Sequence, residues 1–99
     1  MIVKATLNTE NVQEELKRVD FEIKDIIIGI NGDRTTIDIA GERALDVVVI
    51  VVKSTTNRNY AFRLPTDKIH EILNQLNGTN VELEYNTETR EIKITPVKQ

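Results

Sequence analysis

The order of apolar and polar residues along this chain predicts strands first. The most apolar stretch is residues 45–52 (LDVVVIVV), and β-branched side chains of this kind fit a pleated sheet better than a helix. A half-buried strand would alternate apolar with polar residues. The unbroken apolar run at 47–52 therefore predicts a strand that is covered on both faces.

Shorter segments with period-two alternation lie on both sides of this run. They predict strands at residues 2–7, 26–30, 35–40, 60–64, 81–85 and 92–94. Asn31-Gly32 is the strongest hairpin signal, because both residue types tolerate the positive φ of a tight turn. Residues 54–59 (STTNRN) predict a polar loop, and residues 86–89 predict a turn.

Two segments have the spacing of amphipathic helices. Residues 9–19 carry one narrow apolar stripe, with Asn8 or Thr9 as the N-cap. A second helix opens at residues 65–67, with Thr66 as the cap, and Gly78 is placed to end it in a left-handed conformation. The apolar stripes are formed by Val12, Leu16 and Val19 in the first helix and by Ile69, Ile72, Leu73 and Leu76 in the second.

The two halves of the chain follow one plan. A shift of 57 positions places the first strand and helix on residues 60–76, and a shift of 55 places Ile26, Ile28 and Ile30 on Val81, Leu83 and Tyr85, and Ile37 and Ile39 on Ile92 and Ile94. We therefore predict an α+β fold in a single domain, 1–99. It has two βαββ-type pseudo-repeats (1–53 and 59–97), a mainly antiparallel sheet, and both helices on one face. The alternative is an α+β sandwich without internal symmetry.

The composition excludes several kinds of chemistry but does not identify a function. The chain has no Cys and one His, which excludes disulfides, thiol nucleophiles and the usual zinc sites. Its net charge of −3 argues against a simple basic nucleic-acid binder. No basic, apolar leader is recognised at the N-terminus, so we expect a cytoplasmic protein without a membrane segment.

No group of residues with catalytic spacing is found. His70 is interpreted as a solvated histidine on a helix face, and Glu14 and Glu15 point in different directions because neighbours on a helix do not share a face. The sequence therefore predicts a non-enzymatic protein with no cofactor and no metal.

The repeated plan resembles a domain of the DNA sliding clamp family, the rings that tether replicative polymerases. The segment YAFRLPTDKIHEILNQL followed by VELEYNTETREIKIT is similar to the clamp pattern of a strand, a short helix and an acidic-apolar hairpin. The resemblance implies a processivity factor or scaffold of DNA replication or repair. About six copies of one such domain would close a ring around double-stranded DNA without sequence specificity.

The resemblance also implies that the polar faces of both helices line the channel. The nucleic-acid-facing residues would then be Gln13, Lys17, Arg18, Lys68, His70 and Asn74. The alternative is an ordinary solvated helix surface in which Glu14 pairs with Arg18 four residues on.

The apolar run has a second interpretation, as a subunit contact. If residues 45–52 lay at a sheet edge, another chain could add a strand there, and Val47, Val49 and Val51 would form the interface of a homo-oligomer. The alternative function is a small regulatory or inhibitory module that binds protein and does not contact DNA.

Overall fold

The computed structural model describes residues 1–78 and 80–97 of the 99-residue chain. Its elements, in order, are β1 (Ile2–Asn8), α1 (Val12–Glu15), η1 (Leu16–Arg18), β2 (Asp25–Asn31), β3 (Arg34–Ala40), β4 (Val47–Thr56), β5 (Tyr60–Arg63), η2 (Thr66–Lys68), α2 (Ile69–Gln75), β6 (Asn80–Asn86) and β7 (Ile92–Pro96).

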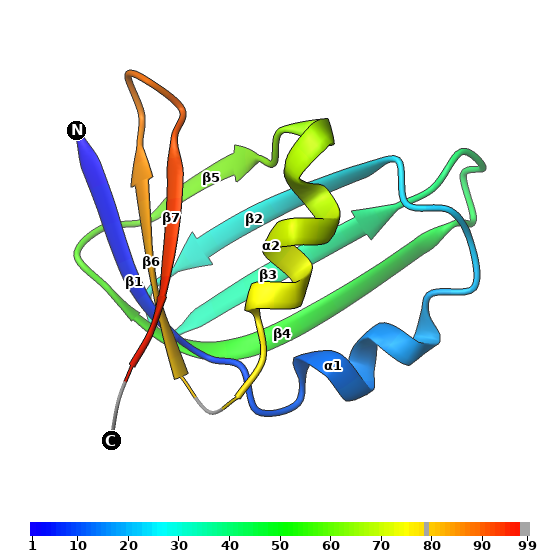
Figure 1. The fold of residues 1–99 in the computed structure, drawn as a ribbon, viewed down its shortest axis with the longest axis horizontal. Helices are drawn as coiled ribbons and strands as arrows, with labels where there is room; N and C mark the ends of the chain where they lie inside the picture. Colours follow the sequence, from blue (N-terminus) through cyan, green and yellow to red (C-terminus); the bar gives the residue numbers. More distant parts are fainter. Residues whose placement is uncertain (79, 98–99) are drawn as a thin grey trace.

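The strands form one sheet in the order β5-β2-β3-β4-β1-β6-β7, and neighbouring strands are antiparallel. β4 connects the β5-β2-β3 part of this sheet to the β1-β6-β7 part, because its residues 47–53 pair with β3 while residues 54–56 pair with β1. Figure 1 shows the result: β2, β3 and β4 run across the view, and β1, β6 and β7 cross them at a steep angle. The sheet is therefore curled rather than flat.

The inner face of the curled sheet and both helices enclose one hydrophobic core. Alternate residues of the strands are buried, and they pack with Val12 of α1 and with Ile69, Ile72 and Leu73 of α2. In Figure 1, α2 crosses β2 and β3, and α1 lies next to β4. The predicted α+β class, with a mainly antiparallel sheet and two helices, is confirmed.

Both helices are shorter than predicted. The first has four α-helical residues, Val12–Glu15, and then tightens into the 3-10 turn η1. Thr9 does not cap it. This residue is buried, and its hydroxyl donates to the carbonyl oxygen of Asn77 at 3.3 Å. Thr66 likewise makes no capping hydrogen bond and begins the 3-10 turn η2. The predicted left-handed conformation of Gly78 is confirmed by its φ of +85°.

The loop predicted at residues 54–59 is wrong in its first half, because β4 continues to Thr56. The polar residue Ser54 is accommodated in the sheet by hydrogen bonds. Its backbone N–H donates to the carbonyl oxygen of Asp33 at 2.9 Å, and its hydroxyl accepts from Thr35 Oγ1 at 2.9 Å. Buried polar groups that are paired in this way do not interrupt a strand.

The hairpin predicted at Asn31-Gly32 is confirmed, but the pair at its tip is Gly32-Asp33. Asn31 and Arg34 are opposite each other in the ladder, and Gly32 has a φ of +62°. A two-residue turn with positive φ only at its first position favours glycine there.

The β6–β7 connection is longer than predicted, and this corrects the matching of the two halves. Asn86 N–H donates to the carbonyl oxygen of Glu91 at 3.0 Å, so residues 87–90 form the loop. Ile92 therefore lies opposite Tyr85 and Ile94 opposite Leu83. Placing Ile37 and Ile39 on Ile92 and Ile94 was thus wrong by two positions. By ladder register, Ile37 corresponds to Ile94.

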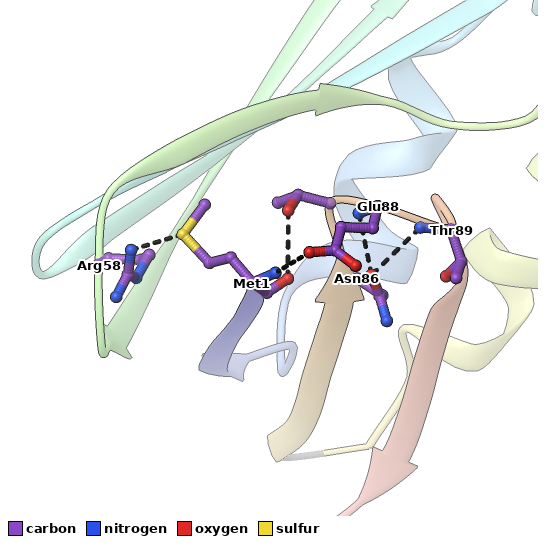
Figure 2. Close-up of polar contacts among 6 residues, drawn as sticks. Met1, Arg58, Asn86, Glu88 and Thr89 are labelled. Carbon is purple, nitrogen blue, oxygen red and sulfur yellow. Dashed lines mark hydrogen bonds and ion pairs between the residues drawn. The ribbon is translucent and has the colours of Figure 1, made fainter.

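Side-chain and terminal contacts explain why this longer loop is ordered. Asn86 Oδ1 accepts hydrogen bonds from the N–H groups of Glu88 and Thr89, at 2.9 and 3.1 Å, as shown in Figure 2. An Asn side chain that bonds to following backbone amides stabilises a turn. The Met1 ammonium lies 3.6 Å from Glu88 Oε1, and Arg58 contacts the Met1 sulfur.

Candidate interaction surface

The outer face of β4 carries a row of exposed valines, which we call the valine row: Val47, Val49 and Val51. Their exposed fractions are 55, 42 and 58%, whereas the alternate residues of β4 point into the core. The prediction that this strand is covered on both faces is therefore wrong for the single chain. Three adjacent exposed β-branched residues on one strand are unusual for a solvated surface and typical of an interaction site.

β4 is not an edge strand, so the predicted edge for strand addition is also corrected. β3 pairs along one side of β4, and β1 pairs with its last residues. Beside the valine row the other side of β4 is flanked by η1, where Arg18 donates to the carbonyl oxygen of Val49 at 2.9 Å. A partner would therefore contact the valine side chains on the sheet face rather than extend the ladder.

A hollow lies on the same face, over β2 and β5. We call it the Gly29 hollow. The small residues Gly29 and Ala61 line it together with Thr36, the polar residues Asn31, Arg34 and Asn59, and Val51 of the valine row. Gly29, Ala61, Thr36 and Val51 form one cross-strand row. A Cβ atom on Gly29 would lie only 2.8 Å from Thr36 Oγ1, so a larger residue here would crowd Thr36 and partly fill the hollow.

Three charged side chains on this face have no ion-pair partner in the described part of the chain. Arg34 and Lys53 are directly opposite in the ladder, and like charges in that relation repel. Asp38 is half-buried in the row between Ile27 and Val49. Within residues 1–78 and 80–97 none of these three charges has an ion-pair partner within 4.0 Å.

Two of the cations predicted to face nucleic acid are paired with neighbouring carboxylates. Lys17 pairs with Glu14 at 2.9 Å and Arg18 with Glu15 at 2.6 Å, so the predicted pairing of Glu14 with Arg18 is replaced by pairs three residues apart. Lys68, His70 and Asn74 are exposed on η2 and α2.

Gln13 has a structural role that the sequence did not indicate. Its side-chain amide donates to the carbonyl oxygens of Leu73 and Leu76, both at 3.0 Å. These carbonyls lie at the C-terminal end of α2, where helix acceptors are left with few backbone partners. Gln13 therefore links α1 to the end of α2.

The loop that leads into the valine row contains a buried carboxylate. Asp46 accepts hydrogen bonds from Arg43 Nη2 at 2.8 Å, Nε at 3.1 Å and the backbone N–H at 3.0 Å. The hydrogen bonds from the Arg43 side chain, and then that from its backbone, lower the pKa of Asp46 below its usual value, and Asp46 in turn raises the pKa of Arg43. This pair was not predicted, although the spacing Arg43-x-x-Asp46 could have indicated it.

We expect this pair to make part of the stability depend on pH. A carboxylate with a lowered folded-state pKa stabilises fully above its unfolded-state pKa of about 3.9, and this contribution is lost as the pH falls through the folded-state value. Asp46→Asn should therefore be less stable than the unchanged chain at pH 7, and the difference in urea midpoint should shrink toward about pH 2. A difference that stays constant across this range would contradict the assignment.

The described residues hold no metal-binding cluster and no membrane-spanning helix. In residues 1–78 and 80–97 no three His, Asp or Glu side chains are grouped closely enough to hold a metal ion, and no helix there is long and apolar enough to cross a membrane. Comparisons with protein-family models, with curated proteins and with solved structures found no match.

Proposed function

We propose that this protein is a non-enzymatic scaffold that self-associates through the valine row. The observation that carries the proposal is the exposure of Val47, Val49 and Val51 on a strand in the middle of the sheet. Covering apolar surface contributes about 25 cal/mol per Å², so a partner that covers this row gains free energy without unfolding either chain. Leu45, 94% exposed just before the strand, extends the apolar surface.

The helix faces support a protein-binding role over DNA binding. A phosphate contact with Lys17 or Arg18 would compete with the carboxylates that already pair with them. Affinity for DNA depends on cations that replace condensed counterions. Cations that are already neutralised by neighbouring acids contribute little to this affinity.

A clamp-like ring around DNA is the second candidate, and one observation favours it. Two ladders have equivalent registers, the one between β1 and β6 and the one between β5 and β2. The equivalence appears when β1 is matched with β5 and β6 is matched with β2. The equivalent pairs are Val3–Tyr85 with Tyr60–Ile30, and Ala5–Leu83 with Phe62–Ile28. This relation supports a twofold repeat, which is the plan of a clamp domain.

The mass in solution distinguishes the two candidates. Sedimentation velocity over a range of concentrations should give a species of twice the 11.3 kDa chain mass for face-to-face association. The ring predicts about six subunits. A single chain mass at every concentration would contradict both.

Retention on DNA gives an independent prediction. We expect the protein to be retained no better on a closed circular duplex than on the same duplex after linearisation. Glu14→Gln with Glu15→Gln should increase retention on both forms at low salt, because it releases Lys17 and Arg18. Retention that is strong on the circle and lost on linearisation would favour the ring.

A further inference from the structure

The valine row and the Gly29 hollow lie next to each other on the outer face. The hollow extends over β5, β2 and β3, and Val51 of the valine row lines it on the β4 side. Val51 is at the same height along the strands as the hollow, because it shares a cross-strand row with Gly29 and Ala61. One copy of the chain therefore carries both a ridge and a place that a ridge of this kind could fill.

We propose that a second copy docks on this face about a twofold axis that runs along the strands, between β2 and β3; this rests on the proposed self-association. Such an axis reverses the strand order, so that β4 of each copy faces β5 of the other. Val51 of each copy then packs into the Gly29 hollow of the other, beside Ala61, and Val49 lies opposite Arg63 of that copy. An axis across the strands would instead set valine row against valine row and leave both hollows empty, which forfeits contacts.

The charges on the face favour the same axis. Arg63, Ile27, Asp38 and Val49 form one cross-strand row. Reversing the strand order places Asp38 of one copy opposite Ile27 of the other, next to Arg63 of that copy. Arg63 contacts Asp25 at 3.1 Å, but its side chain is 68% exposed. It can therefore bind a second carboxylate, and Asp38, which shares its cross-strand row, has no ion-pair partner within residues 1–78 and 80–97.

Single cysteines test the orientation directly, because the chain contains no Cys. Val51→Cys and Ala61→Cys are both exposed positions, where substitution leaves the core unchanged. Facing sheets lie about 10 Å apart, so a short bismaleimide is used in place of direct disulfide formation. The Ala61→Cys chain is labelled with ¹⁵N, so that mass spectrometry separates mixed from like cross-linked pairs.

We expect the mixed Val51→Cys/Ala61→Cys product to exceed each like product at least tenfold at equal concentrations. Lys93→Cys, exposed on β7, is the control and should cross-link to neither. Dominant linkage of Val51→Cys to itself, or no linkage in a sample with a dimer mass, would overturn the orientation and leave self-association standing. No linkage in a sample with the mass of one chain would overturn both.

Discussion

Val49→Lys is expected to abolish self-association while leaving the fold intact. Val49 is the middle residue of the valine row, and its side chain points away from the core. A lysine here carries a charge into the contact and competes with the other copy's Arg63 for Asp38, which lies directly opposite it in the ladder. This should raise the dissociation constant at least 100-fold, about 3 kcal/mol. The substitution on a solvated strand face costs the single chain less than about 1 kcal/mol. Sedimentation velocity measures the first effect and thermal unfolding the second.

Thr55→Lys provides the matched control for this variant. Thr55 is exposed on the same strand, past the valine row, where β4 pairs with β1. It adds the same charge at nearly the same distance from the core, so it should associate like the unchanged chain. If Val49→Lys and the unchanged chain showed the same mass at every concentration, the valine row would not be the interface.

Leu83→Ala is expected to have the largest effect on stability. Leu83 is 1% exposed on β6, where it lies between Ala5 of β1 and Ile94 of β7. Truncating a buried leucine removes about 2–5 kcal/mol, through lost transfer free energy and the cavity that remains. In a chain of this length each kcal/mol lowers the Tm by about 4–8 °C. Urea unfolding followed by circular dichroism measures the loss.

Ile28→Ala tests whether the two halves share that core. Ile28 is also 1% exposed, and it lies in β2 between Ile37 of β3 and Phe62 of β5. We expect a loss in the same range and, for both variants, one unfolding transition. Two transitions, or a loss below about 1 kcal/mol for either variant, would contradict a common core.

The strands were predictable because their side chains report local geometry. The alternation of Ile26, Ile28 and Ile30 with other residues indicates a strand that has one buried face. This pattern can be recognised in the sequence even when the neighbouring strands are not known. The helix lengths were overestimated because an apolar stripe does not show which tertiary contacts compete with helical hydrogen bonds and caps. Thr9 bonds to Asn77, far along the chain, instead of capping α1.

The exposure of the outer face of β4 could not be predicted from the sequence. An unbroken run of apolar residues is equally compatible with burial inside one chain and with burial between chains. Only the structure separates these cases, by showing that Val47, Val49 and Val51 are exposed. The Gly29 hollow could not be predicted at all, because it depends on β5 pairing with β2 across about 30 intervening residues.

Dilution followed by NMR tests the central claim most directly. Methyl and amide shifts of Val47, Val49 and Val51 are recorded as the protein is diluted, with Glu82 and Glu84 on β6 as reference positions. We predict concentration-dependent shifts at the valines and none at the glutamates. Valine shifts that stay constant while the sedimentation coefficient changes would show that the chains associate through another surface.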